Sequence, residues 1–137
     1  MFYEQHKDWI TEQEHTDIIK SVVLADKWSF GQTSDDGRYD LNFPMWTQGF
    51  FKVKDQQFTQ DTPDIIKTIS LRFVAQCPED YVLIRSMACA NTFGLDGDFH
   101  TDWPSPNKSV TGVLYTDRTW ERNWGGDTTF VGEDGLY

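Results

Sequence analysis

The chain has 137 residues and a formal net charge of −10, the size of one domain with room for a core. It contains no run of lysine or arginine, and binding to a nucleic-acid backbone needs a basic surface, so we expect no nucleic-acid partner. No apolar stretch approaches the roughly 20 residues of a membrane helix, and the polar N-terminus lacks the apolar core of a signal peptide. We expect a cytoplasmic protein without a membrane partner, in which the two cysteines, Cys77 and Cys89, are free thiols.

The N-terminal part predicts one helix followed by loops. Thr11 and Glu14 have the spacing of a capping box, in which each side chain bonds the backbone of the other residue. Apolar residues at helical spacing follow, so we expect a helix from about Thr11 to Ala25 with one apolar face against the body. His15, in the first turn of this helix, is expected to be a solvated side chain. Residues 26–44 are rich in turn formers and are expected to form loops.

A second helix is predicted between two prolines. Thr62 is expected to cap its N-terminus, Pro63 suits the first helical position, and the helix should end at Cys77 because Pro78 cannot continue the hydrogen-bond ladder. From residue 81 onward the apolar residues alternate with a period of two, which is typical of strands. The expected strands are 49–53, 81–91, 99–102, 110–115 and 127–131.

This order of elements indicates an α+β fold of one domain. Helices followed by a series of strands with short turns favour a sandwich or barrel as the core. The helical part is expected over about residues 1–80 and the β core over about residues 81–137.

His100 and Asp102 are the first candidates for a functional site. In an extended segment, residues i and i+2 point to the same side, so this imidazole and this carboxylate can converge on one ion. Iron(II) sites made of two histidines and one carboxylate use such a pair. The pair alone is a weak signal, because His100 could be a polar residue at a strand end and Asp102 could form an Asx turn.

The residues around the pair resemble the prolyl 4-hydroxylase-like branch of the Fe(II)/2-oxoglutarate-dependent oxygenases. That branch has an H-x-D, then a strand that ends in a tyrosine-containing turn, then a tryptophan and a Gly-Gly strand. The corresponding residues here, in the same order, are His100-x-Asp102, Thr111-x-Val113-x-Tyr115, Trp120 and Gly125-Gly126-Asp127-Thr128-x-Phe130.

The resemblance implies a double-stranded β-helix, or jelly roll, with the N-terminal helices packed outside it. It also implies hydroxylation of an unactivated C–H bond, of a peptidyl residue such as proline, with Fe(II) as cofactor, 2-oxoglutarate as cosubstrate and ascorbate as a further reductant. The implied site residues are His100 and Asp102 for the metal, Tyr115, Thr111 and Asn91 for the cosubstrate, and Trp103 for the substrate. Gly125 and Gly126 are expected to form a tight turn, and Trp120 to be a core anchor.

The family pattern also requires a second histidine and a basic residue that binds the cosubstrate carboxylate, both after the Gly-Gly strand. The other two of the three histidines lie in the N-terminal region, and no lysine or arginine follows Arg122. We therefore expect a C-terminally incomplete domain with impaired activity, which dimerises through its open sheet edge. The alternatives are a natural two-ligand variant, a non-catalytic jelly-roll module that binds sugar through tryptophans, a cupin-like metal enzyme that does not use 2-oxoglutarate, and a pseudoenzyme that serves as an interaction partner.

Overall fold

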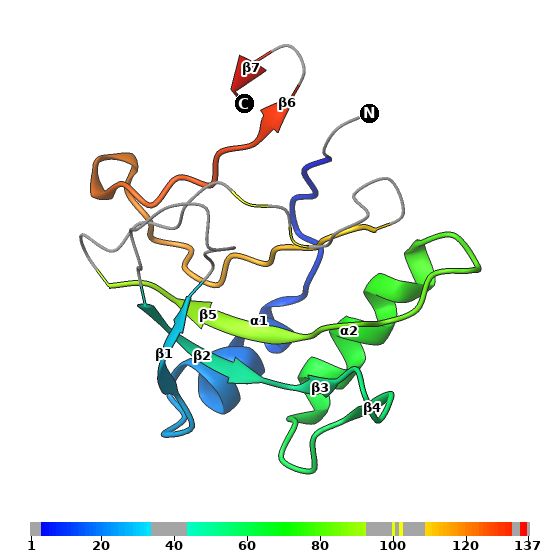
Figure 1. Cartoon of the computed structure of the whole chain (residues 1–137). Coiled ribbons are helices and arrows are strands. Elements are labelled where there is room, and N and C mark those ends of the chain that lie inside the picture. Colours follow the sequence, from blue (N-terminus) through cyan, green and yellow to red (C-terminus); the bar gives the residue numbers. More distant parts are fainter. Residues whose placement is uncertain are drawn as a thin grey trace.

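Helices α1 (Glu12–Ile18) and α2 (Asp64–Gln76) pack beside a three-stranded antiparallel sheet. The computed structural model describes residues 4–33, 44–92, 100, 102, 109–132 and 135–136 (Figure 1). The sheet has the order β1 (Ser29–Thr33), β2 (Pro44–Gly49) and β5 (Met87–Ala90). Two small antiparallel ribbons accompany it, β3 (Phe51–Lys52) with β4 (Gln57–Phe58), and β6 (Val131–Gly132) with β7 (Gly135–Leu136). The predicted α+β class is therefore confirmed.

Helix α1 begins with the predicted capping box. The Glu14 amide donates to the Thr11 hydroxyl at 3.2 Å, and the Thr11 amide donates to a Glu14 carboxylate oxygen at 2.8 Å. The helix continues as a π-helical turn over Ile19–Val23, so its predicted extent is largely confirmed. The expectation for His15 is wrong, because its side chain is partly buried and its Nε2 donates to the carbonyl of Thr116 at 2.7 Å.

Helix α2 ends as predicted, with Cys77 as the C-cap, but it begins differently. Thr62 does not cap it. The Thr62 side chain is buried, its hydroxyl donates to the carbonyl of Phe50 at 2.8 Å, and it lies 2.7 Å from the Thr59 hydroxyl. The residue before the helix is Pro63, whose backbone carbonyl accepts the first helical hydrogen bonds. Thr62 thus satisfies the backbone beside β3 instead of the helix terminus.

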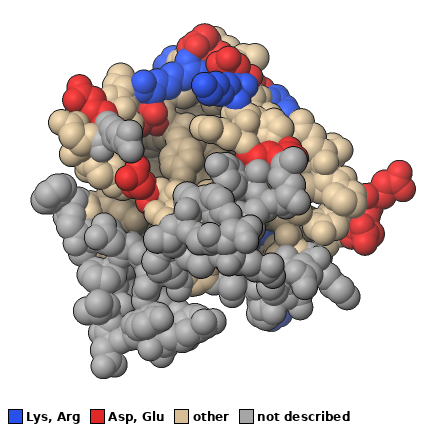
Figure 2. Space-filling view, turned by 90° about the horizontal axis from the view of Figure 1, so that it is seen from above, with Lys and Arg blue, Asp and Glu red and all other residues tan. Residues whose placement is uncertain are grey.

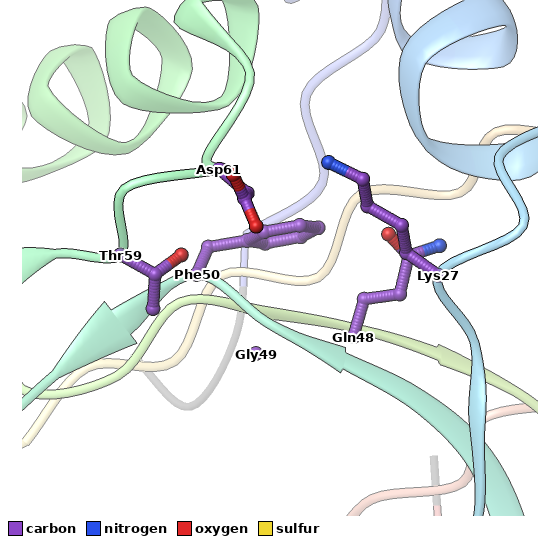
Figure 3. A pocket seen from close by; sticks show the side chains of 6 residues that line it. All are labelled: Lys27, Gln48, Gly49, Phe50, Thr59 and Asp61. Carbon is purple, nitrogen blue, oxygen red and sulfur yellow. The ribbon is translucent and has the colours of Figure 1, made fainter.

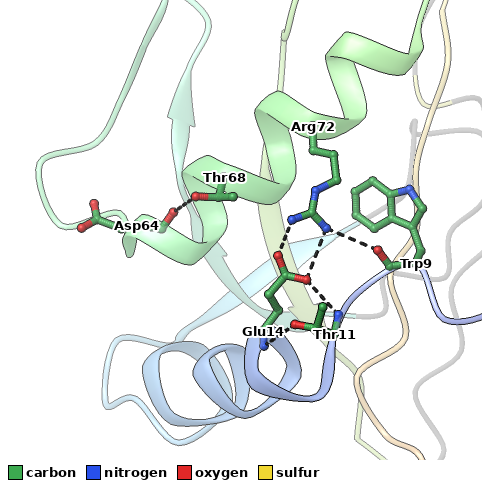
Figure 4. A network of polar contacts seen from close by, with 6 residues as sticks. All are labelled: Trp9, Thr11, Glu14, Asp64, Thr68 and Arg72. Carbon is green, nitrogen blue, oxygen red and sulfur yellow. Dashed lines mark hydrogen bonds and ion pairs between the residues drawn. The ribbon is translucent and has the colours of Figure 1, made fainter.

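A polar network joins the two helices (Figure 4). Arg72 of α2 donates to both carboxylate oxygens of Glu14 and, at 3.3 Å, to the carbonyl of Trp9. The Arg72 guanidinium also lies 5.4 Å from the centre of the Trp9 ring, within the range of a cation–π interaction. The Glu14 carboxylate therefore caps α1 and anchors α2 at the same time.

The apolar core lies between the helices and the sheet. Its buried members are Ile18, Val22, Phe50 and Ile66, and Ala88 of β5 packs against them. Ser86, just before β5, accepts a backbone hydrogen bond from Phe50 at 2.8 Å, and its hydroxyl lies 2.9 Å from that of Ser70 on α2. Ser86 and Ala88 therefore face the helices, while their neighbours in the alternation face away from them.

Strand β1 and the first residue of β2 lie where the sequence predicted loops, so that expectation is wrong for residues 29–33 and 44. Their pairing is irregular between Phe30 and Gln32, and the rings of Phe30 and Trp46 lie 5.0 Å apart across the two strands. A short strand that contains a glycine and a bulge does not show the strict alternation by which strands are recognised.

The predicted strand at 110–115 is wrong, because residues 111–117 are irregular and pair with no strand among the described residues. This segment rests on the helices instead: Gly112 lies against the ring of Phe73 on α2, and Thr116 bonds His15 of α1. The other predicted strands are shorter than expected. Ladder residues within 49–53 are Gly49 of β2 and Phe51–Lys52 of β3; within 81–91 they are Met87–Ala90, and within 127–131 Val131 alone. Residues 99 and 101 of the predicted strand 99–102 lie outside the described residues.

Acidic and basic side chains lie interspersed on the face seen from above (Figure 2). In the described part of the chain, neither helix is long and apolar enough to cross a lipid bilayer.

Candidate functional site

The side chains of His100 and Asp102 lie together. Nε2 of His100 is 3.2 Å from Oδ1 of Asp102, and the two side chains are 32% and 34% exposed. This proximity is what the i, i+2 spacing predicts for an extended segment. The pair is therefore accessible to a ligand from solvent.

Arg85 is a third member of this site, and sequence reasoning missed it. Its Nη2 lies 3.6 Å from the same Oδ1 of Asp102, and its side chain is 52% exposed. Residues 85, 87 and 89 alternate with Ser86 and Ala88, so they share the face of this segment that points away from the helices. The same period-two pattern that predicted a strand here could have placed Arg85 on this face, but not opposite Asp102.

Cys89 lies in the electrostatic field of the same group. Burial raises the pKa of the Cys89 thiol; the positive charge of Arg85 opposes this effect, and the negative charge of Asp102 adds to it. Cys89 is therefore a neutral thiol at pH 7. Both Cys77 and Cys89 are free, which confirms that prediction.

The pair fits two positions of a metal site. Nitrogen and oxygen ligands lie about 2.1 Å from a transition metal, so two ligands at a right angle are separated by about 3 Å. The separation of 3.2 Å between Nε2 and Oδ1 is close to this value. However, the residues that the structure describes include no group of three His, Cys, Asp or Glu side chains that could hold an ion. The same separation also fits a hydrogen bond from the imidazole to the carboxylate.

Among the described residues, no contact joins the predicted cosubstrate residues to the pair. The hydroxyl of Tyr115 donates to that of Thr128, and Tyr115 is exposed. Thr111 and Asn91 are also exposed. Their roles stay predictions, as does that of Trp103, which lies outside the described residues.

The segment after residue 118 forms the predicted tight turn. Gly125 and Gly126 have φ angles of +74° and +77°, which favour glycine. Nε1 of Trp120 donates to the carbonyl of Gly125 at 2.8 Å, and a Cβ on Gly126 would lie 3.1 Å from the Trp120 ring. The expectation of Trp120 as a core anchor is wrong, because it is exposed and fastens this turn at the surface.

A separate hollow of about 360 Å³ opens beside β2 (Figure 3). Lys27 and Asp61 lie above the buried ring of Phe50, and Gln48 donates to the carbonyl of Val22 at 2.9 Å. None of the residues that line it belongs to the group around Asp102. The hollow therefore gives no additional ligand to that group.

Comparison with protein-family models, with curated proteins and with solved structures found no match to this chain.

Proposed function

We propose that the protein is an Fe(II)- and 2-oxoglutarate-dependent oxygenase that hydroxylates an unactivated C–H bond, with a peptidyl residue such as proline as the substrate class. The observation that supports this proposal is the convergence of His100 Nε2 and Asp102 Oδ1 at 3.2 Å. A double-stranded β-helix, with residues 81–137 as its core, is the architecture that we propose with it.

His100 and Asp102 would be the protein's own contribution to the metal site. The lone pair of a neutral imidazole and a carboxylate oxygen are ligands that suit iron(II) with open positions for other molecules. When bound, Fe(II) would supply the activation of O2, with one oxygen atom entering the substrate and the other entering the succinate that forms from 2-oxoglutarate with loss of CO2. The chain itself would orient the reactants and select the substrate.

Two protein ligands bind a metal less tightly than three. Because the described residues supply no third side chain beside the pair, the proposal requires one from elsewhere. His15 is not suited to the task, since its Nε2 is engaged with the carbonyl of Thr116. We therefore expect weak iron binding and low turnover by this chain.

An anaerobic titration with Fe(II) and 2-oxoglutarate tests the proposal through the visible charge-transfer band of the chelate. We expect a saturable band that is lost in His100→Ala and in Asp102→Ala. The matched controls His6→Ala and Asp55→Ala remove an imidazole and a carboxylate from exposed positions and should keep the band. The absence of a band in the unmodified protein, or its persistence in both site variants, would refute the proposal.

A second candidate function is a non-catalytic binding module. The observation in its favour is the exposed pair of Trp120 and Trp124, whose rings lie 5.5 Å apart at 79°. Exposed aromatic rings offer apolar faces to a sugar. Such a module would bind an oligosaccharide without metal and would be insensitive to His100→Ala, which calorimetry can measure.

A further inference from the structure

The hollow beside β2 has a floor that hydrogen bonds hold in place. Phe50, whose ring lines the hollow, is 5% exposed. The Phe50 amide donates to the carbonyl of Ser86 at 2.8 Å. The Phe50 carbonyl accepts from the amide of Thr59 and from the hydroxyl of Thr62, both at 2.8 Å. The backbone of Phe50 is therefore fully bonded, and its ring offers a fixed apolar surface to a ligand in the hollow.

Lys27 and Asp61 place opposite charges over this floor without neutralising each other. Figure 3 shows the ammonium of Lys27 and the carboxylate of Asp61 above the Phe50 ring. The two residues come from different parts of the fold, since Lys27 precedes β1 and Asp61 precedes α2. Within the described part of the chain, neither side chain forms an ion pair or a hydrogen bond. Both charges are therefore available to a ligand that enters the hollow.

Two further side chains offer oxygen acceptors to the hollow. Gln48 is 6% exposed, and its carboxamide nitrogen donates to the carbonyl of Val22 at 2.9 Å. Its carboxamide oxygen points toward the hollow (Figure 3) and accepts no hydrogen bond from the described residues. The single hydroxyl hydrogen of Thr62 goes to a backbone carbonyl, so Thr59 is the donor across the 2.7 Å between the two hydroxyls. The Thr59 oxygen therefore keeps its capacity to accept.

These groups match a small ligand that carries one ammonium and one carboxylate. An ammonium has three N–H donors, so it suits the carboxylate of Asp61 and the neighbouring acceptors, and the face of an aromatic ring also attracts a cation. A carboxylate suits Lys27. Because the charges of Lys27 and Asp61 sum to zero, a zwitterion balances both of them, whereas a singly charged ligand leaves one unbalanced. The volume of about 360 Å³ is at the lower end of the range of about 300–1,000 Å³ for ligand pockets.

We propose that the hollow binds an apolar α-amino acid, with its carboxylate at Lys27, its ammonium at Asp61 and its side chain on the ring of Phe50. An α-amino acid combines the two charges and an apolar group in one small molecule. The lining shares no residue with the group around Asp102, so this inference does not depend on the oxygenase proposal.

The test compares phenylalanine with three analogues, each of which lacks one of the recognised groups. N-Acetylphenylalanine lacks the ammonium, phenylalaninamide lacks the carboxylate, and glycine lacks the apolar side chain. A nuclear magnetic resonance titration of the isotope-labelled protein measures each affinity, and the amide signals of Gly49 and Thr59 report on the hollow. Phenylalanine should shift these signals to saturation, and each analogue should bind about threefold to tenfold more weakly.

Two variants assign the charges of the ligand to residues of the hollow. Lys27→Met should weaken the binding of phenylalanine about threefold to tenfold but should not weaken that of phenylalaninamide, which has no carboxylate to lose a partner. Asp61→Asn should weaken the binding of phenylalanine by a similar factor but not that of N-acetylphenylalanine. Both residues are exposed, so neither change removes a core contact. The matched controls Lys52→Met and Asp55→Asn remove the same charges from exposed positions outside the hollow and should bind phenylalanine as the unmodified protein does.

Three results would overturn the inference. If phenylalanine causes no saturable shift of the two amide signals, the hollow does not bind an amino acid. Equal affinities for phenylalanine and for the two analogues that lack a charge would mean that the charges of the hollow do not recognise the ligand. An unchanged phenylalanine affinity in both Lys27→Met and Asp61→Asn, or an equal loss in the two controls, would place the ligand elsewhere on the protein.

Discussion

Glu14→Gln should destabilise the protein more than any other change of one charged residue in α1. The substitution keeps the shape of the side chain but removes the negative charge that Arg72 contacts through two nitrogens. The Arg72 side chain and, after it, the backbone N–H of Thr11 lower the pKa of Glu14 from 4.5 to about 2. The folded protein therefore holds Glu14 in its charged form.

The magnitude follows from the contacts that are lost. Hydrogen bonds to charged groups contribute about 1.5–3 kcal/mol each when well formed, and exposed ion pairs contribute less than 1 kcal/mol. The Glu14 side chain is 17% exposed and that of Arg72 is 34% exposed, so we expect a loss of about 1–2 kcal/mol, between these limits. A loss of this size lowers Tm by about 3–8 °C in a domain of intermediate length.

The effect should depend on pH in a defined direction. Because the pKa of Glu14 is lower in the folded state than the ordinary value of 4.5, its contribution is complete above pH 4.5. The contribution is lost as the pH falls from 4.5 towards 2. The difference in stability between the unmodified protein and Glu14→Gln should therefore shrink over this range and stay constant from pH 5 to pH 7.

Urea unfolding followed by circular dichroism at several pH values measures this difference. Glu12→Gln is the matched control, since Glu12 lies in the same turn and pairs with Arg118, but its side chain is 84% exposed. It should change stability much less. If the two variants were equally stable, or if the Glu14→Gln difference did not change between pH 5 and pH 3, the network in Figure 4 would not hold the helices together as we argue.

The remaining predictions concern packing and association. Gly112→Ala should destabilise the protein by about 1–3 kcal/mol, because the added Cβ would lie 2.7 Å from the Phe73 ring, and Phe73→Leu should relieve this loss in the double variant. The control is Gly49→Ala, whose added Cβ meets no atom within 4 Å; its stability in thermal unfolding should stay within about 0.5 kcal/mol of that of the unmodified protein. His15→Ala should cost about 1 kcal/mol in urea unfolding, as the loss of one hydrogen bond to a backbone carbonyl, and an unchanged midpoint would show that this bond is not stabilising. Light scattering should show a molar mass that rises with concentration, since several apolar side chains in 110–130 are exposed, and a constant monomer mass would contradict this.

The elements that the sequence predicted well are those that depend on neighbouring residues. The capping box of Thr11 and Glu14 spans one helical turn, and the end of α2 follows from Pro78 directly after Cys77. The predicted strand at 110–115 failed for a different reason. Alternation reports that one face of a segment meets apolar neighbours, but it does not say whether the neighbour is a strand or, as for Gly112, the ring of Phe73 on a helix.

For the candidate site too, the sequence predicted the part that depends on neighbouring residues and missed the part that depends on distant ones. His100 and Asp102 are two residues apart, a spacing from which the sequence predicted that their side chains would meet, and the two side chains lie 3.2 Å apart. Arg85 reaches Asp102 from the segment before β5, across a part of the chain whose path no periodicity determines. Its role at the site is a tertiary contact, and no spacing rule in the sequence gives its partner.

The three side chains also contact one another without a metal, and a metal would have to replace these contacts. In the structure, His100 Nε2 lies at hydrogen-bond distance from Asp102, whose charge Arg85 balances. A nitrogen that donates its proton to a carboxylate cannot offer its lone pair to a cation, so binding through Nε2 requires the imidazole to carry its proton on Nδ1 instead. Asp102 would also exchange its contact with Arg85 for the ion. The metal affinity is therefore set by the strength of the new bonds minus that of the two existing contacts. Arg85→Met removes one of those contacts and should raise the metal affinity.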